Sequence, residues 1–332
     1  MGYNVLSKYR TELMGIAILW VMLFHASGLD MGLSFLNLIR AAGFGGVDIF
    51  ILLSSMGLVM SLGRREQDYS SFMARRAGRL LPAYFLVMVP YTIFLALCRD
   101  GHFSALIWNA SLLYYWVRPP GAFNWYVAGA MTFYAVTPLC FRSLRRSPRR
   151  EALTAAGILL GLVVGRLLMA EGYWYAMDFV YRIPIFLLGL LLGFYVLEGR
   201  KLNGTDILFW CVWLGLGIVY LLCFGKGPNP DYRPMCYLFL FTTVPMCLVI
   251  CWCFDRLPLG WLRKFFRLLG GHSLEIYLLN VSLFAETELL GKFFHVQPGQ
   301  RLFYLLSFAA NIALGLPLHC LAEKLKTARG AA

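Results

Sequence analysis

A histidine and an aspartate stand inside stretches of sequence that are otherwise apolar. His25 lies in the run from Leu13 to Leu29, which only His25 and Ser27 interrupt, and Asp48 lies near the start of the next run. Imidazole changes its charge near neutral pH, and either group is costly in hydrocarbon, so such residues are functional sites by default. A carboxylate that hydrogen-bonds an imidazole orients the ring and raises its basicity. The pair therefore predicts proton transfer.

Three arginines form a second group of residues that could bind a ligand. Arg75, Arg76 and Arg79 fall within five residues, just before a further apolar run. Guanidinium groups bind phosphate oxygens in bidentate fashion, so this spacing predicts a phosphate clamp. The alternative is that the three arginines only mark the cytoplasmic end of a membrane helix.

The elements that must position these groups are membrane helices. The chain has 332 residues, of which 60% are hydrophobic and 14% charged, and a soluble domain carries far more charge. We expect one all-α integral membrane domain over residues 1–332, without a separate soluble domain. About ten transmembrane helices are predicted, at 11–29, 43–62, 80–98, 123–141, 152–170, 179–198, 205–224, 236–254, 272–290 and 302–322. The shorter apolar piece 106–116 is expected to be re-entrant or interfacial.

The basic residues orient this predicted bundle. With a cytoplasmic N-terminus, the inside segments carry 21 lysines and arginines and the outside segments seven. This bias predicts that both termini are cytoplasmic, in a multi-pass protein of the cell (plasma or inner) membrane. The seven outside residues are Arg40, Arg99, Arg118, Lys226, Arg233, Lys292 and Arg301.

Depth in the membrane groups the polar residues further. At about 1.5 Å per residue, His25 lies about 22 Å along its helix from Arg10, in the outer third of the bilayer, and Asp48 is expected at a similar depth. Arg166 and Arg182 also fall in the outer third and Asn124 lies at the outer mouth of its span, so all five could line one cavity. The alternatives are that Asp48 caps its helix and that the two arginines snorkel to headgroups. Near the inner face, Glu275 either joins a site or pairs with an arginine.

Other classes of function lack support in the sequence. The net charge of +13 is spread over short loops between apolar runs, which argues against a nucleic-acid partner. Nine cysteines show neither a disulfide framework nor the spacing of a zinc site. No metal-binding constellation and no Gly-x-Ser-x-Gly motif is present, so we expect no metal, no bound cofactor and no serine nucleophile. A homo-oligomer stays open.

The order of six motifs resembles acyltransferase family 3, integral membrane acyltransferases that include O-acetyltransferases of bacterial surface polysaccharides. The first is similar to the family's opening helix, which ends in a histidine, here His25. The second contains Asp48, the third the arginine triplet, the fourth Asn124 and Trp125, the fifth Arg182 and the sixth Asn280. They read ELMGIAILWVMLFHA, GGVDIFILLSSMGLV, FMARRAGRLLPAYF, NWYVAGAMTFYAVTP, YRIPIFLLGLLLG and LGGHSLEIYLLN.

The chain departs from the family pattern at three positions. Met14 stands where an arginine is usual, eleven residues before the histidine, and Arg10 is one turn earlier. Ala130 replaces a frequent glutamate, and Asn280 replaces a common histidine at the end of the ninth-span motif.

The resemblance implies transfer of an acyl group, acetyl above all, from cytoplasmic acyl-CoA as co-substrate to a hydroxyl of a cell-surface or exported glycan. Arg75, Arg76 and Arg79, with Arg10, would bind the donor. His25, oriented by Asp48, would act as the base, or as a nucleophile that forms an acyl-histidine. Arg166, Arg182, Asn124 and Trp125 would bind the acceptor or the oxyanion, and Glu275 and Asn280 are further candidates.

A membrane transporter or permease for a small solute is the rival interpretation. Intramembrane histidine, aspartate and arginine residues also suit a proton-coupled carrier. Thioester consumption that depends on an acceptor would favour the enzyme. Solute accumulation without thioester consumption would favour the carrier.

Overall fold

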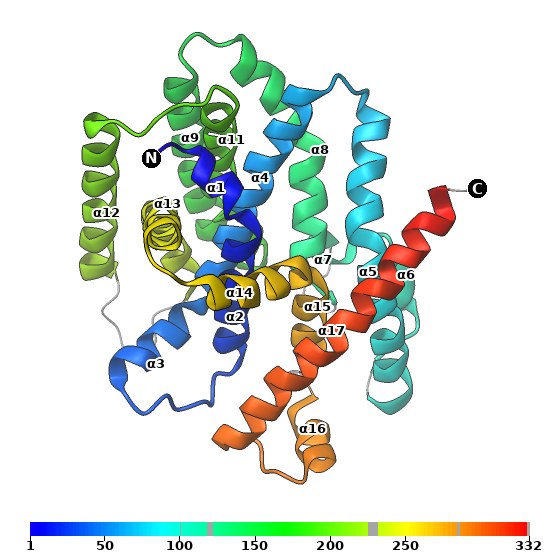
Figure 1. Cartoon of the computed structure of the whole chain (residues 1–332). Coiled ribbons are helices and arrows are strands. Elements are labelled where there is room, and N and C mark those ends of the chain that lie inside the picture. The colour runs from blue at the N-terminus through cyan, green and yellow to red at the C-terminus, as the bar shows by residue number, and fades with distance from the viewer. Residues whose placement is uncertain (100, 118–121, 225–231, 284–285, 331–332) are drawn as a thin grey trace. The chain divides into compact units, whose positions relative to one another are not determined.

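The computed structural model describes residues 1–99, 101–117, 122–224, 232–283 and 286–330, and these are predominantly α-helical (Figure 1). They contain no β-strand, and a lone bridge joins Gly2 and Lys201. The predicted all-α fold is confirmed. The helices are α1 (Asn4–Lys8), α2 (Arg10–His25), α3 (Ser34–Ala41), η1 (Ala42–Gly45), α4 (Gly46–Arg64), α5 (Tyr69–Cys98), α6 (Ser104–Ala110), α7 (Tyr114–Val117), α8 (Trp125–Arg146), α9 (Arg150–Ala170), η3 (Trp174–Ala176), α10 (Met177–Val180), α11 (Ile183–Leu197), α12 (Gly204–Phe224), α13 (Tyr232–Arg256), α14 (Gly260–Gly271), α15 (Ser273–Leu283), α16 (Thr287–Phe294) and α17 (Arg301–Gly330).

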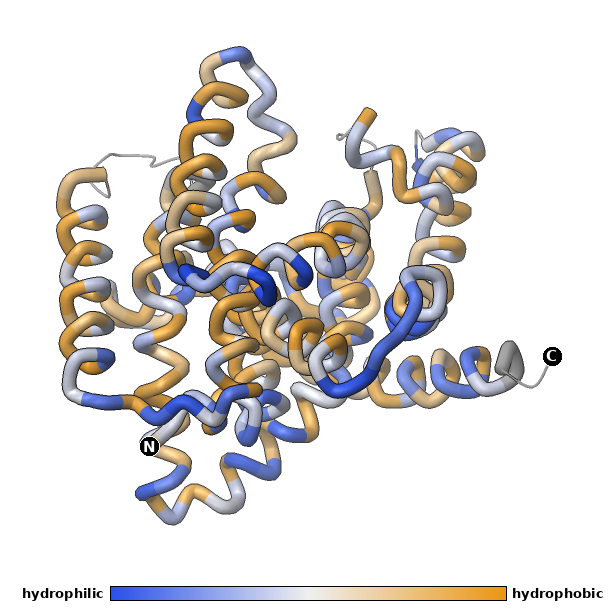
Figure 2. The backbone as a smooth tube through the Cα atoms, turned by 90° about the horizontal axis from the view of Figure 1, so that it is seen from above, coloured by the Kyte–Doolittle hydropathy of each residue, from blue (hydrophilic) through white to orange (hydrophobic). Residues whose placement is uncertain are grey.

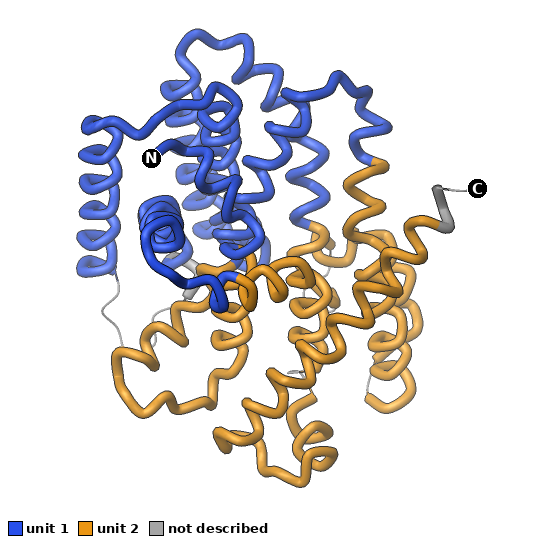
Figure 3. The backbone as a smooth tube through the Cα atoms, in the orientation of Figure 1, with its two compact units in different colours: residues 1–13, 47–73, 129–263 blue, residues 14–46, 74–128, 264–332 orange. Residues whose placement is uncertain are grey.

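The helices form two compact units, each built from three separate stretches of chain (Figure 3). Unit 1 comprises residues 1–13, 47–73 and 129–263, and contains α4 with α9 to α13. Unit 2 comprises residues 14–46, 74–128 and 264–332, and contains most of α2 and α5 with α15 to α17. The expectation of a single domain over the whole chain stays a prediction.

Seven helical stretches in the described residues are long and apolar enough to cross a membrane. They agree with seven of the ten predicted spans, and their hydrophobic character is visible along the tube in Figure 2. These stretches are 34–64, 69–98, 150–170, 174–197, 204–224, 235–256 and 301–327. In three of them, at α9, α12 and α17, no more than 22% of the most apolar window is buried. Apolar faces of this size need lipid around them, so the chain is a multi-pass membrane protein. The full count of ten and the cytoplasmic termini stay predictions.

The three remaining predicted spans differ in length or hydropathy. The prediction of one helix over 11–29 is wrong at its end, because α2 stops at His25. Gly32 has a positive φ of 81°, and Asp30 accepts a hydrogen bond from its N–H, so a turn replaces the last helical turns. The helix predicted over 272–290 is also shorter, because α15 ends at Leu283.

The last predicted span and the predicted interfacial piece also differ from what their apolar residues indicated. Helix α8, predicted over 123–141, has 22 residues, but tryptophan, tyrosine, threonine and proline lower its hydropathy. The apolar piece 106–116 forms two short helices, α6 and α7, rather than one. Two of the predicted outside basic residues, Arg118 and Lys226, lie outside the described residues.

Close packing of α4 on α11 organises the interior of unit 1. A Cβ atom on Gly189 would lie 2.6 Å from the carbonyl oxygen of Leu52, and one on Gly193 would lie 2.9 Å from that of Met56. Only glycine permits such an approach of two helix backbones. Both contacts advance in the same direction along the two helices, so α4 and α11 run parallel. Parallel direction is what the predicted order requires of the second and sixth spans.

Candidate active site

His25 is the last residue of α2 and lies in unit 2 with its side chain half-buried. Its Nδ1 atom is 2.9 Å from the carbonyl oxygen of Val21, one turn earlier on the same helix. A carbonyl oxygen can only accept, so Nδ1 must donate the hydrogen, and in the neutral ring Nε2 then carries the lone pair. The backbone of α2 therefore orients the imidazole and leaves Nε2 as the basic atom.

The turn that follows His25 is held by its own polar contacts. Asp30 accepts hydrogen bonds from the side chain of Asn37 at 2.8 Å and from the N–H of Gly32 at 3.0 Å. These two hydrogen bonds lower the pKa of the exposed Asp30 carboxyl, the one from Asn37 most. Arg301, at the start of α17, donates to the carbonyl oxygen of Asp30 at 3.1 Å. The end of α2 and the start of α17 are thereby tied together.

Three buried polar side chains on α15 and α17 lack partners for some or all of their polar atoms among the described residues. Asn280 is 0% exposed, and neither its Nδ2 nor its Oδ1 has a hydrogen-bond partner. Ser307 and Asn311 are 1% and 0% exposed, and the Oγ of Ser307 and the Oδ1 of Asn311 are likewise unpartnered. The Nδ2 of Asn311 donates to the carbonyl oxygen of Ser307 at 2.8 Å. Most buried polar groups in proteins are satisfied, so each exception needs a water, a ligand or a function to explain it.

The register of α15 against α17 brings Asn280 and Asn311 to one level, and a contact at Gly28 joins the end of α2 to α17. A Cβ atom on Gly315 would lie 2.7 Å from the side chain of Ile276, so α17 and α15 approach closely there. Asn311 on α17 and Asn280 on α15 each lie one turn from that contact, and the two helices run antiparallel. At the other end, a Cβ atom on Gly28 would lie 2.5 Å from the hydroxyl of Tyr304. His25 and Ser307 each lie three residues along the chain from this contact.

We call His25, Asn280, Ser307 and Asn311 the polar cluster. The cluster combines one basic nitrogen with amide and hydroxyl groups that can donate or accept hydrogen bonds. Such a set can remove a proton from a hydroxyl and hold a polar oxygen in an apolar surrounding. His25 and Asn280 were predicted as site residues from the sequence, whereas Ser307 and Asn311 were not. Their spacing of four residues inside an apolar run was the signal, because it puts both on one helix face.

Asp48 lies in unit 1, in the first turn of α4, and its partner there is Arg182. The Nε atom of Arg182 is 3.9 Å from Oδ2 of Asp48, and the two side chains are 2% and 1% exposed. Arg182 also donates from Nη1 to the carbonyl oxygen of Asp178 at 2.7 Å, at the residue before α11. Snorkelling, the alternative for Arg182, is wrong because the side chain is buried. The pairing of Asp48 with His25 stays a prediction.

Asn124 and Trp125 lie at the start of α8 within unit 2. The Oδ1 atom of Asn124 accepts the N–H of Val127 at 3.0 Å, which makes Asn124 the N-cap of α8, and its Nδ2 donates to the hydroxyl of Tyr277 at 3.1 Å. Trp125 is half-buried, with its ring 5.9 Å from that of Tyr126. Asn124 thus has a structural role in addition to its predicted acceptor role, which stays a prediction.

Glu275 pairs with a histidine rather than with an arginine. Its Oε1 atom is 3.0 Å from Nδ1 of His319 on α17, and the ring of His272 packs edge-on against His319 at 4.7 Å. Glu275 is buried while His319 is part-exposed. The pair fixes the register of α15 against α17, which is the register that aligns Asn280 with Asn311.

The predicted donor arginines occupy different surroundings. Arg75 and Arg79 are exposed on α5, and Arg76 is half-buried on the same helix. Arg10 lies over Gly57 of α4 within unit 1, where a Cβ atom on the glycine would be 2.8 Å from its Nη1. Arg166 is exposed in the last two turns of α9, as the snorkelling alternative requires. Their predicted roles in binding the donor or the acceptor stay predictions.

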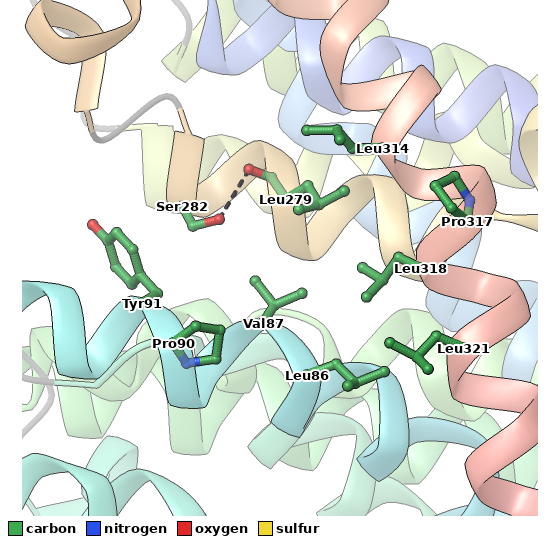
Figure 4. A pocket seen from close by; sticks show the side chains of 10 residues that line it. All are labelled: Leu86, Val87, Pro90, Tyr91, Leu279, Ser282, Leu314, Pro317, Leu318 and Leu321. Carbon is green, nitrogen blue, oxygen red and sulfur yellow. Dashed lines mark hydrogen bonds between the residues drawn. The ribbon is translucent and has the colours of Figure 1, made fainter.

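An apolar pocket lies between α5, α15 and α17 of unit 2 (Figure 4). Its volume is about 430 Å³, and leucine, valine and proline side chains form most of its wall. Only Tyr91 and Ser282 bring hydroxyl groups to it, and Ser282 donates to the carbonyl oxygen of Leu279 (Figure 4). The pocket can hold hydrocarbon, but it lacks a basic group for proton transfer.

The family model for the acyltransferase domain matches residues 13–320, which include the polar cluster. The chain belongs to acyltransferase family 3. The exopolysaccharide production protein ExoZ of Rhizobium meliloti (strain 1021) is 28% identical over 221 residues, which cover 60% of this chain and 65% of ExoZ. The chain therefore spans somewhat less than two thirds of the length of this curated relative. No solved structure matches the chain.

Membership of acyltransferase family 3 states the class of reaction. The matching family model is that of an acyltransferase domain. Acyl transfer to a hydroxyl needs a base for the hydroxyl proton and donors for the carbonyl oxygen as it gains charge. The polar cluster contains groups of both kinds within one compact unit.

Proposed function

We propose that this protein is an O-acyltransferase that moves an acyl group, acetyl above all, from acyl-CoA to a hydroxyl of a surface or exported polysaccharide. The family supplies the reaction class, and the name of the relative ExoZ points to exopolysaccharide production. The observation that carries the proposal is the hydrogen bond from His25 Nδ1 to Val21, which leaves Nε2 as a base in the compact unit that also holds the unpartnered polar groups.

In the proposed reaction, Nε2 of His25 takes the proton of the acceptor hydroxyl as its oxygen attacks the thioester carbonyl carbon. The tetrahedral intermediate carries its negative charge on the former carbonyl oxygen, and the amide Nδ2 of Asn280 donates to that oxygen. When the carbon–sulfur bond breaks, the CoA thiolate leaves and takes the proton from the imidazolium. The ester forms and CoA is released, so atoms and charge balance.

Two predicted residues change role in this proposal. The carbonyl oxygen of Val21 orients the ring of His25, so Asp48 is not needed for that purpose. Asp48 instead neutralises Arg182 in the interior of unit 1, where an unpaired charge would be costly. Acceptor binding by Arg166, Asn124 and Trp125, and donor binding by Arg75, Arg76, Arg79 and Arg10, remain parts of the proposal.

A transfer assay with one histidine variant tests the function. Vesicles that contain His25→Gln receive labelled acetyl-CoA and de-acylated polysaccharide, and both acylated glycan and free CoA are measured. The loss of a general base predicts a fall in rate of about 10² to 10⁴-fold. The matched control is His102→Gln, an exposed histidine outside the polar cluster, which should keep the full rate. Full transfer by His25→Gln, at normal membrane insertion, would sink the proposal.

A further inference from the structure

A second, polar cavity lies in unit 1, where the loop between α4 and α5 meets the last turns of α8. Its volume is about 890 Å³, within the range of cavities that hold small ligands. Buried Phe72 and Phe141 contribute to its apolar part. Four arginines line it, namely Arg65, Arg142, Arg145 and Arg146. We call it the α4–α8 cavity.

The four arginines have no carboxylate partner among the described residues, which separates them from other arginines of unit 1. Arg150 pairs with Glu198, and Arg200 pairs with Asp206 at 2.6 Å. Arg142 lies three residues from Arg145 and four from Arg146, so all three point along one face of α8 and repel one another. A cluster of like charges around a cavity is relieved when an anion binds there.

The two acidic residues at the cavity do not neutralise it. Glu66 and Asp68 face four guanidinium groups. The carboxylate of Asp68 already accepts hydrogen bonds from the hydroxyl of Ser70 and from the N–H of Ser71 at 2.9 Å, at the start of α5. Asp68 is therefore committed to capping α5, and the cavity keeps an excess of positive charge.

We propose that the α4–α8 cavity binds a phosphate-bearing ligand through Arg65, Arg142, Arg145 and Arg146. Guanidinium groups match the geometry of phosphate oxygens and bind them in bidentate fashion. None of the predicted donor arginines, Arg75, Arg76, Arg79 and Arg10, lines this cavity. The exposed aromatic ring of Tyr69 at the same cavity offers a face on which a nucleotide base can stack.

Two sources supply this chemistry, and they can be separated. One is the phosphorylated adenosine end of the acyl donor, an assignment that rests on the proposed function. The other is the headgroup of an acidic phospholipid. The first predicts binding of free CoA in neutral detergent, and the second predicts a requirement for acidic lipid.

A charge-matched pair of double variants tests the proposal on the full-length protein. Arg142→Gln with Arg146→Gln removes two charges from the cavity. The control, Arg64→Gln with Arg149→Gln, also removes two charges. Arg64 ends α4 and Arg149 directly precedes α9, and both are exposed and do not line the cavity. Titration calorimetry in neutral detergent measures binding of CoA, with pantetheine as the probe that lacks phosphate. A parallel series in phosphatidylcholine nanodiscs, with and without phosphatidylglycerol, measures the rise in Tm that acidic lipid causes.

The expected result is a loss of CoA affinity of roughly tenfold or more in the cavity variant, since hydrogen bonds between charged groups are lost. The control variant should stay within about twofold, and pantetheine should not bind measurably. If the cavity variant loses the Tm response to phosphatidylglycerol and keeps CoA affinity, the phosphate site stands and its ligand is a lipid. Equal losses in both double variants, or none in either, would overturn the proposal.

Failure of this proposal and failure of the proposed function give different results. Binding is measured without an acceptor, so it does not depend on catalysis by His25. His25→Gln should bind CoA as the parent does while losing transfer. Active His25→Gln would refute the catalytic proposal and leave the binding data unchanged.

Discussion

Replacement of Asn280 by leucine should make the protein more stable and less active. The side chain is 0% exposed, and neither of its polar atoms has a partner among the described residues. An unsatisfied buried polar group costs about 1 to 3 kcal/mol, whereas leucine has the same number of side-chain heavy atoms, branched at the same carbon, and no polar atom. Asn280→Leu should therefore raise the free energy of unfolding by about 1 to 3 kcal/mol, which corresponds to a Tm higher by a few degrees.

The same substitution should slow transfer. If the amide of Asn280 donates to the oxyanion, its loss should lower kcat by about 10² to 10³-fold. Tm in neutral detergent and the transfer rate with labelled acetyl-CoA are measured on the same preparation. Opposite changes in the two quantities are the expected signature of a group kept for function at a cost in stability.

Asn124→Leu is the matched control, because it makes the same chemical change at a satisfied site. Asn124 caps α8 and donates to Tyr277, so its loss should cost about 1 kcal/mol or more and lower Tm. If Asn280→Leu lowers Tm as the control does, the amide of Asn280 serves packing. If Asn280→Leu keeps the parental rate, the polar cluster is not the reaction site.

Three further outcomes follow from contacts within the units. Arg182→Met should lower the free energy of unfolding by about 3 to 5 kcal/mol, since it strands a buried carboxylate, and adding Asp48→Asn should restore much of the lost Tm. Gly193→Ala should lower Tm, because its new Cβ would lie 2.6 Å from the side chain of Val59, whereas Gly215→Ala has no atom within 4 Å and should raise Tm slightly. The lowered pKa of Asp30 predicts a contribution to stability that is present above pH 3.8 and is lost on acidification, so Asp30→Asn should flatten the acid limb of a plot of Tm against pH.

Hydropathy was sufficient to predict most of the long helices. Runs such as 205–224 and 152–170 differ from the observed helices by no more than two residues at either end, because a lipid environment demands about 20 apolar residues in a row. The end of α2 was not predictable in the same way. Residues 26–29 are apolar enough to continue a helix, and the turn depends on hydrogen bonds of Asp30 with residues that come later in the sequence.

The types of residue at the site were predictable from the sequence, but which of their polar atoms have hydrogen-bond partners was not. Asn124 and Asn280 look equivalent in sequence, as asparagines at the edge of apolar runs, yet only Asn124 has partners in the structure. Asp48 was expected to orient His25, because a carboxylate is the usual partner of an imidazole. The observed partner of Nδ1 is a backbone carbonyl oxygen, and every residue of a helix has one, while the pairing of His25 with Asp48 stays a prediction. Side-chain patterns cannot reveal such a partner.

The short length of α2 has a consequence for how the acceptor reaches His25. Its 16 residues span about 24 Å at 1.5 Å per residue, less than the roughly 30 Å of hydrocarbon in a bilayer. The segment after His25 is not helical, and Ser27, Gly28 and Asp30 within it are exposed. Non-helical backbone at membrane depth is stable only where protein buries it or where water reaches it. We therefore expect water to reach these exposed residues at the end of α2, and in the proposed reaction the acceptor hydroxyl would approach Nε2 along the same route.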